Sequence, residues 1–199
     1  MLSWVNGFTP FYKFTYQSLL PIEVNLYWVT YTNDKDRLLL DILKEAISIE
    51  IYGREYYSIF SELIEDENAK SIFRGLSRDE GEHRELLEKE YKKIAGKPFD
   101  IGVVDEENRE KARRIFPESL EPLGIEETKD TLKLGIRTEE RSIELYSKSA
   151  QETRNKSSKD LFLKLMHFEG EHKKLLEDSL YYLDQEGSWY GYSPPTIEG

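Results

Sequence analysis

The chain has 199 residues, contains no cysteine and carries a formal net charge of −11. A chain of this length can bury the core of one ordinary domain without disulfides or a structural zinc. The absence of cysteine excludes disulfides, iron–sulfur clusters and thiol nucleophiles, so any metal site must use carboxylate and imidazole ligands. The acidic balance leaves no broad basic surface for a phosphate backbone, which argues against nucleic acid as a partner.

Residues 1–35 form an aromatic-rich extension that is interrupted by Pro10 and Pro21 and has no charged segment before an apolar run. We therefore expect no signal peptide and a cytoplasmic protein. No apolar stretch reaches the roughly 18 residues that span a bilayer, so we expect no membrane partner. Residues 22–32 alternate in a way that favours a strand. A strand pinned to the main domain, a mobile arm and a dimer contact remain open interpretations.

Two helices are predicted in the first half of the remaining chain. Apolar residues recur at helical spacing over residues 37–65 and again, after the polar break 65–68, as far as Gly96. Asp34 or Asp36 would cap the start of the first helix. Gly96 would cap the end of the second.

The second half of the chain repeats this organisation after a long connection. Residues 97–127 contain three prolines, and one short charged helix is predicted there over residues 106–115. Two more long helices are predicted over residues 128–154 and 157–185. The tail, residues 187–199, does not read as helical.

The two helix pairs are related by a gapless internal repeat with an offset of 89 residues. It aligns Glu50 with Glu139, and it aligns the run EGEHRELLE that begins at Glu80 with the run EGEHKKLLE that begins at Glu169. Such a repeat predicts two similar helical hairpins about a pseudo-two-fold axis. We therefore expect an all-α fold in which residues 36–186 form a four-helix bundle with a long crossover connection.

Each half of the repeat carries one Glu on its first helix and a Glu-x-x-His pair on its second. Residues three apart on a helix share one face, so the pair offers a carboxylate and an imidazole together. Counting residues to and from the hairpin turn puts the single Glu level with that pair. The candidate metal ligands are Glu50, Glu80, His83, Glu139, Glu169 and His172.

The charge of this set indicates which metals it suits. Four carboxylates buried together would shift their pKa values by several units through desolvation and mutual repulsion, at about 1.36 kcal/mol per unit. Two divalent cations would balance the four negative charges, and each neutral imidazole would give one nitrogen to one metal. Mixed oxygen and nitrogen ligands with open positions suit iron, or manganese, better than calcium or a closed zinc site.

These residues, in this order and spacing, resemble the rubrerythrin branch of the ferritin-like diiron-carboxylate superfamily over roughly residues 37–185. The resemblance implies a ferritin-like bundle that holds two iron ions. The implied roles are bridging ligands for Glu80 and Glu169, ligands to one iron for Glu50 and His83, and ligands to the other iron for Glu139 and His172.

The chain departs from rubrerythrins proper in two ways. Rubrerythrins also carry a Cys-rich rubredoxin domain and a further Glu ligand three residues after the ligand of the third helix. Here that position is Ser142, and the chain contains no cysteine. The resemblance therefore implies that electrons come from a separate donor.

The resemblance implies an oxidoreductase that reduces hydrogen peroxide or dioxygen, as in protection against oxidative stress. The alternative is a ferroxidase or iron-storage protein, which would need a cage that no feature of the sequence indicates. A purely structural or partner-binding bundle leaves the clustered core carboxylates unexplained. Exchange of a helix pair through residues 97–127 is open, so we expect a homo-oligomer such as a dimer.

Tyr57 and Tyr146 lie two turns from Glu50 and Glu139 on the same helix faces. A phenol there would bond a ligand carboxylate or transfer a proton or an electron. The alternative is an ordinary aromatic core residue. We list both tyrosines as candidate supporting residues of the site.

Other conspicuous residues are not expected to bind metal. His167 lies off the ligand face and is expected at the surface or in packing. Four glutamates are expected on solvated faces: Glu82, Glu85, Glu140 and Glu144. Three aromatic residues of the tail are expected to cover a bundle end or a subunit contact: Trp189, Tyr190 and Tyr192.

Overall fold

The computed structural model describes residues 34–114, 122–185 and 189. Within them lie five helices and no strand: α1 (Asp34–Leu63), α2 (Glu67–Ala95), α3 (Gly102–Arg113), α4 (Ile125–Glu152) and α5 (Lys156–Gln185). The all-α prediction is confirmed. The strand predicted over residues 22–32 and the tail other than Trp189 fall outside the described residues. None of these five helices combines the length and the apolar run needed to cross a membrane.

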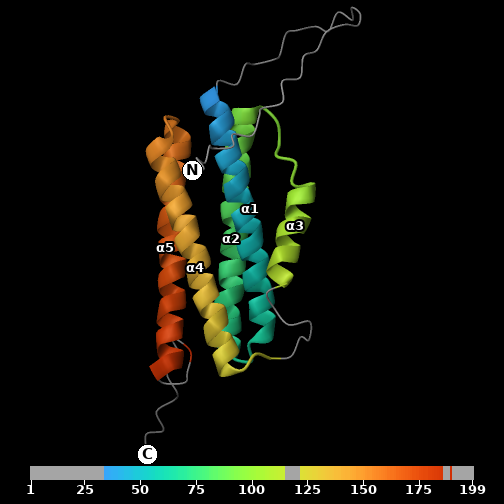
Figure 1. Ribbon diagram of the computed structural model, residues 1–199, viewed down its shortest axis with the longest axis vertical. Coiled ribbons are helices and arrows are strands. Elements are labelled where there is room, and N and C mark those ends of the chain that lie inside the picture. Colours follow the sequence, from blue (N-terminus) through green and yellow to red (C-terminus); the bar gives the residue numbers. More distant parts are fainter. Residues whose placement is uncertain (1–33, 115–121, 186–188, 190–199) are drawn as a thin grey trace, which may run out of the picture. The chain divides into compact units, whose positions relative to one another are not determined.

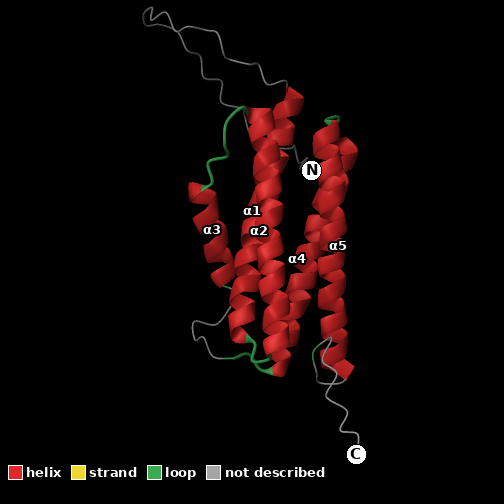
Figure 2. Cartoon of the chain, turned by 180° about the vertical axis from the view of Figure 1, so that it is seen from behind, coloured by secondary structure: helices red, strands yellow, loops and turns green. Residues whose placement is uncertain are grey.

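The four long helices form two antiparallel hairpins, α1 with α2 and α4 with α5 (Figures 1 and 2). The turns of the two hairpins lie at opposite ends of the bundle. Helix α1 packs against α4, helix α2 packs against α5, and the short helix α3 covers the outer side of α1. This is the predicted bundle of two repeated hairpins with a long crossover connection.

The helix ends differ from the predicted ones by a few residues. Helix α1 begins at Asp34, so both Asp34 and Asp36 lie inside the helix and neither precedes it as the predicted cap. Helix α4 begins at Ile125, three residues early, because its first turn holds Glu126 and Glu127. Acidic side chains favour a helix N-terminus but break the apolar periodicity on which the prediction relied.

The internal repeat extends to the hairpin turns. The Oδ1 atom of Asp66 accepts a hydrogen bond of 2.8 Å from the backbone N–H of Ala69 at the start of α2. At the equivalent place, Oδ1 of Asn155 accepts one of 3.1 Å from the N–H of Ser158 in α5. Gly96 ends α2 in the left-handed conformation, with φ of 70°, as predicted for a glycine cap.

Two apolar clusters fill the bundle. One holds Tyr57 and Phe73, whose rings stack with centroids 6.2 Å apart. The other holds their repeat equivalents Tyr146 and Phe162, stacked at 6.1 Å. Trp189 packs edge-on against Phe73, which matches its predicted place at a bundle end. Because the clusters draw on opposite ends of the helices, a layer between them is left for polar residues.

Helix α3 is fixed to the bundle by charge. The carboxylate of Glu55 in α1 accepts hydrogen bonds from Arg109 at 2.8 Å and from Arg113 at 3.1 Å. The repeat equivalent of Glu55 is Glu144, which is exposed on α4. Within the described part of the crossover connection, helix α3 therefore packs on the first hairpin.

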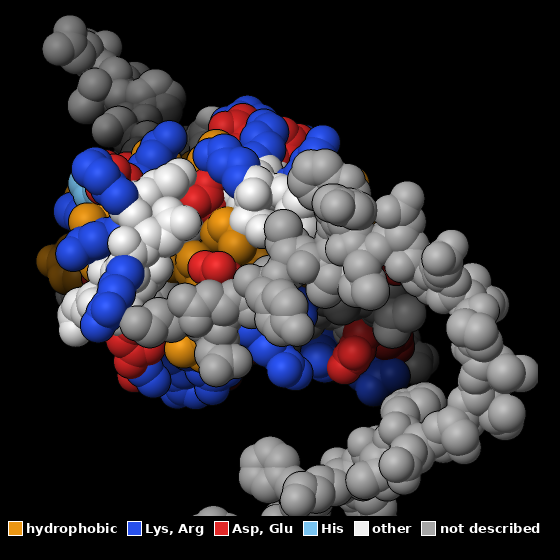
Figure 3. Space-filling view, turned by 90° about the horizontal axis from the view of Figure 1, so that it is seen from above, with side chains coloured by type: hydrophobic (Ala, Val, Ile, Leu, Met, Phe, Trp, Pro, Cys, Tyr) orange, Lys and Arg blue, Asp and Glu red, His pale blue; other side chains and the backbone are white. Residues whose placement is uncertain are grey.

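Figure 3 looks onto the end of the bundle where α1 begins, and it shows hydrophobic side chains lying between charged ones. A pocket of about 640 Å³ is lined there by Leu38, Leu39 and Ile42 of α1 and by residues 152–155.

A buried carboxylate outside the predicted site joins the hairpins at this end. Glu90, near the end of α2, accepts hydrogen bonds from Ser158 Oγ at 2.8 Å and Ser157 Oγ at 3.1 Å. Lys93 Nζ donates to it at 2.8 Å. Because Glu90 is only 3% exposed, these partners replace its lost hydration.

We expect Glu90→Ala to lower the free energy of unfolding by about 2–4 kcal/mol, because it leaves the buried hydroxyl of Ser158 without its acceptor. Urea denaturation of the metal-free protein measures this loss. Glu85→Ala is the matched control, since Glu85 is exposed on the same helix. Equal stabilities of the two variants would contradict the bridging role of Glu90.

Candidate metal centre

The six predicted ligands lie at one level of the bundle. Glu50 lies 13 residues before the end of α1 at Leu63, and Glu80 lies 13 residues after the start of α2 at Glu67. The second hairpin has the same spacing, from Glu139 to the end of α4 and from the start of α5 to Glu169. All six side chains are buried, with exposed fractions of 7% or less.

Four of the six side chains meet closely. Atoms of Glu80, His83, Glu169 and His172 lie within 4.8 Å of one another. Nδ1 of His83 lies 3.0 Å from Glu169 Oε1 and 3.8 Å from Glu80 Oε2. Nδ1 of His172 lies 3.2 Å from each of the other two oxygens, Glu80 Oε1 and Glu169 Oε2. Each central carboxylate thus turns one oxygen towards each histidine.

Glu50 and Glu139 flank this group from α1 and α4. Oε2 of Glu50 lies 3.5 Å from Nδ1 of His83. Glu139 interacts electrostatically with Glu169 and His172. The structure therefore brings Glu50 into contact with the histidine of its own hairpin, and it places Glu139 where its charge interacts with that of His172.

The two predicted tyrosines bond the flanking carboxylates across the hairpins. The hydroxyl of Tyr57 in α1 donates to Oε1 of Glu139 in α4, and the hydroxyl of Tyr146 in α4 donates to Oε1 of Glu50 in α1. Both rings also lie in the apolar core. Each tyrosine is therefore both a core residue and a hydrogen-bond donor to a candidate ligand. Each tyrosine serves the opposite half of the repeat, which spacing on one helix does not reveal.

Several ligand atoms lack a protein partner. Among the described residues, four buried atoms of the site accept or donate no hydrogen bond: Glu50 Oε2, Glu80 Oε1, His83 Nδ1 and Glu169 Oε1. A buried polar atom without a partner costs roughly 1–3 kcal/mol. A cation among them would satisfy all four together, so these residues fit the metal that their chemistry implies.

The electrostatics point the same way. Burial and the neighbouring carboxylates, Glu169 foremost, raise the pKa of Glu80 and of Glu139 well above the usual range. Burial would also raise the pKa of Glu169, but close contacts with both histidines, His172 foremost, outweigh it and hold the pKa at about 2. Burial opposes charge on the histidines, yet the carboxylates raise the pKa of His83 to about 12 and of His172 to about 9. Without a cation, protons must neutralise the cluster.

Close packing supports one of the central carboxylates. A Cβ atom at Gly53 would lie 3.3 Å from Cδ of Glu80, so only glycine leaves this carboxylate its full space. The repeat equivalent of Gly53 is Ser142, the position where rubrerythrins proper carry a further Glu. Ser142 is buried, and its hydroxyl donates at 3.3 Å to the carbonyl of Thr138 within α4.

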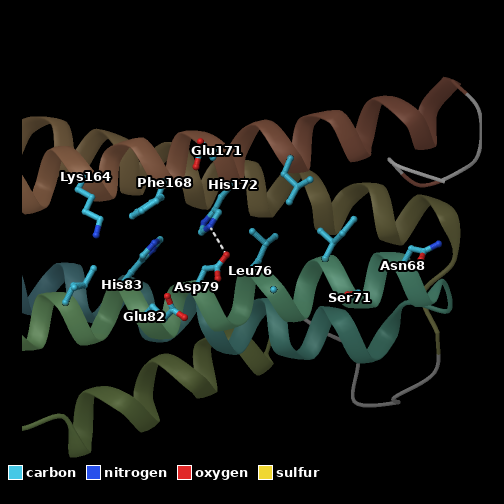
Figure 4. A pocket seen from close by; sticks show the side chains of 14 residues that line it. Asn68, Ser71, Leu76, Asp79, Glu82, His83, Lys164, Phe168, Glu171 and His172 are labelled. Atoms are coloured by element: carbon cyan, nitrogen blue, oxygen red, sulfur yellow. Dashed lines mark ion pairs between the residues drawn. The ribbon is translucent and has the colours of Figure 1, made fainter. Parts of the chain in front are cut away.

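A groove of about 840 Å³ between α2 and α5 reaches both histidines (Figure 4). Asp79 and Phe168 line it beside them. Oδ2 of Asp79 lies 3.8 Å from Nε2 of His172, and the ring of Phe168 stacks on His83 with centroids 5.3 Å apart. Neither residue was expected at the site from the sequence. The 89-residue offset does align Asp79 with Phe168, two residues of different type, whereas it aligns the ligands with residues of the same type.

The residues that were not expected to bind metal lie outside the cluster. His167 is exposed and lies 3.5 Å from Glu171. The four glutamates predicted on solvated faces are exposed: Glu82, Glu85, Glu140 and Glu144. Tyr190 and Tyr192 fall outside the described residues.

Metal affinity should rise with pH. Because the pKa values of Glu80, Glu139, His83 and His172 are raised, the metal-free site holds protons at neutral pH that a cation must displace. We expect the association constant for Mn(II) to increase about tenfold per pH unit for each proton released. Calorimetric titration in buffers of different ionisation enthalpy counts these protons. An affinity that stays constant with pH would contradict the proton-filled site.

Comparisons with known proteins agree with this geometry. The chain is similar to a solved structure of a hypothetical protein from Pyrococcus furiosus, with a TM-score of 0.59 and 24% sequence identity over 73% of this chain and 89% of that chain. This likeness bears on the fold alone. No curated protein matches the chain. The family model for rubrerythrin matches residues 41–180, which include all six predicted ligands. The chain belongs to the rubrerythrin family.

Proposed function

We propose that the chain is a diiron oxidoreductase that reduces hydrogen peroxide or dioxygen with electrons from a separate donor. The observation that carries the proposal is the buried set of four carboxylates and two imidazoles at one level of the bundle. Oxygen and nitrogen ligands of this kind suit iron, and manganese is the other metal they would accept. Membership of the rubrerythrin family supports iron.

The positions of the ligand atoms support a division of roles. Glu80 and Glu169 would contact both metals, since each turns one oxygen towards each histidine. Glu50 and His83 would be the remaining ligands at one metal position, and Glu139 and His172 would be those at the other. Two Fe(II) ions so held would supply the two electrons that, with two protons, reduce one hydrogen peroxide molecule to two water molecules.

The tyrosines hold the flanking carboxylates in place. Each hydroxyl donates to one oxygen of Glu50 or Glu139 and leaves the other oxygen for a metal. Burial, followed by the nearby carboxylates, raises the pKa of Tyr57 and of Tyr146 well above the usual range. Both phenols therefore keep their protons and remain donors.

The oxidant would reach the site through the groove between α2 and α5. The side of the site towards α1 and α4 is closed by Tyr57 and Tyr146, which are at most 1% exposed. The groove, in contrast, is lined by both histidines.

The electrons would come from another protein or a small reductant. The chain contains no cysteine and so cannot form the thiolate iron site of a rubredoxin domain. Removal of peroxide under oxidative stress is the role that this chemistry would serve.

Anaerobic loading with Fe(II) followed by rapid mixing with hydrogen peroxide or dioxygen tests the proposal. We expect two irons per chain, one peroxide consumed per two Fe(II), and renewed activity after chemical reduction. The variant with Glu80→Ala and Glu169→Ala should bind no iron, whereas the groove-lining control Glu82→Gln should behave as the wild type. Uptake of hundreds of irons per assembly would instead indicate storage and contradict the proposal.

Loss of either tyrosine hydroxyl should weaken one metal position. We expect Tyr57→Phe and Tyr146→Phe each to lower the affinity for one of two metals about tenfold, because a supporting hydrogen bond to a ligand is lost. Tyr52→Phe is the control, since Tyr52 is a half-buried neighbour on α1 outside the site. Unchanged binding of both metals in both variants would show that the tyrosines serve packing only.

A further inference from the structure

We propose that the two metal positions are inequivalent and that Asp79 is a positioning residue which makes the position at His172 the tighter one. This inference rests on the proposed metal centre. The inference goes beyond the proposed metal centre because it assigns different metal affinities to the two half-sites. The repeat gives these half-sites the same three types of ligand.

The asymmetry lies at one pair of repeat-related positions. The offset of 89 residues aligns every ligand with a ligand of the same type, and Tyr57 with Tyr146. It aligns Asp79, however, with Phe168. Both residues stand in the groove beside a histidine (Figure 4), so the mismatch falls next to the ligands.

At His172, a carboxylate lies on the outer side of the ring. Nδ1 faces the central carboxylates, and Nε2 lies 3.8 Å from Oδ2 of Asp79. The other oxygen of Asp79 accepts a hydrogen bond of 3.5 Å from Arg78, which helps to fix the carboxylate. At this ion-pair distance the charge of the carboxylate favours the proton on the outer nitrogen, which leaves the metal-facing nitrogen free to bind a cation.

At His83, no such carboxylate is present among the described residues. The three carboxylate oxygens near this histidine all lie on the Nδ1 side. Phe168 stacks over the ring at an interplanar angle of 17°. The outer N–H lies in the plane of the imidazole, so a ring stacked above that plane cannot accept its hydrogen bond.

The nearby charges add to this difference. Lys164 lies with Nζ 5.4 Å from the centroid of Phe168, and Figure 4 shows it towards the His83 end of the groove. The repeat equivalent of Lys164 is Gly75, and the guanidinium of Arg78, which is paired with Asp79, lies 4.0 Å from the place of a Cβ atom at Gly75. Asp79 nevertheless contacts His172 directly, whereas Lys164 contacts the ring that stacks on His83, and this difference favours a cation at His172.

Titration of the metal-free protein with Mn(II), followed by calorimetry and by electron paramagnetic resonance, tests the inference. We expect two binding steps in the wild type. Asp79→Asn should weaken the tighter step about 10- to 100-fold and leave the weaker step unchanged. The converse change, Phe168→Asp, should strengthen the weaker step. The control Glu171→Gln removes one charge from the same groove wall and should change neither step.

The outcomes separate this inference from the proposal on which it rests. Two bound metals whose affinities are both unchanged, or equally weakened, in Asp79→Asn would overturn the inference and leave the metal centre intact. A wild type that takes up no Mn(II) or Fe(II) would overturn both.

Discussion

Burying carboxylates side by side is the constraint on which the rest of the structure depends. Glu50, Glu80, Glu139 and Glu169 lie in the interior of a helical bundle, where desolvation and like charge oppose their ionisation. Only cations or protons can offset this repulsion, and the raised pKa values of Glu80, Glu139 and both histidines favour protons there in the absence of a cation. Stability must then come from elsewhere, namely from the two apolar clusters and their stacked aromatic rings.

The internal repeat places six candidate ligands at one level of the bundle, which a single hairpin with three of them cannot do. Each hairpin supplies three candidate ligands at a fixed distance from its turn, and the antiparallel arrangement of the two hairpins brings both sets to the same level. The hydrogen bonds of Tyr57 and Tyr146 then cross between hairpins, so each half of the site is held by the other. The site is therefore a property of the assembled bundle.

Local patterns in the sequence predicted the fold and the shared level of the candidate ligands in the bundle. Helical periodicity and the count from each turn need only residues of one hairpin, so Glu50 and Glu80 could be placed level with each other. Contacts between hairpins were not predictable in this way. The crossed pairing of the tyrosines and the bonds of Glu90 to α5 depend on how two amphipathic faces dock. The contact of Asp79 with His172 also depends on this docking. Its one sign in the sequence is that the repeat aligns Asp79 with Phe168, a residue of different type.

The most direct test of the metal centre is a crystal structure of the protein loaded with Mn(II) or Fe(II), with the metals located by anomalous diffraction. The account predicts two peaks about 3.5–4 Å apart. Both should contact Glu80 and Glu169, and each should contact Nδ1 of one histidine, His83 or His172. A single peak, a metal held by Nε2 in the groove, or metals only at exposed carboxylates would contradict it.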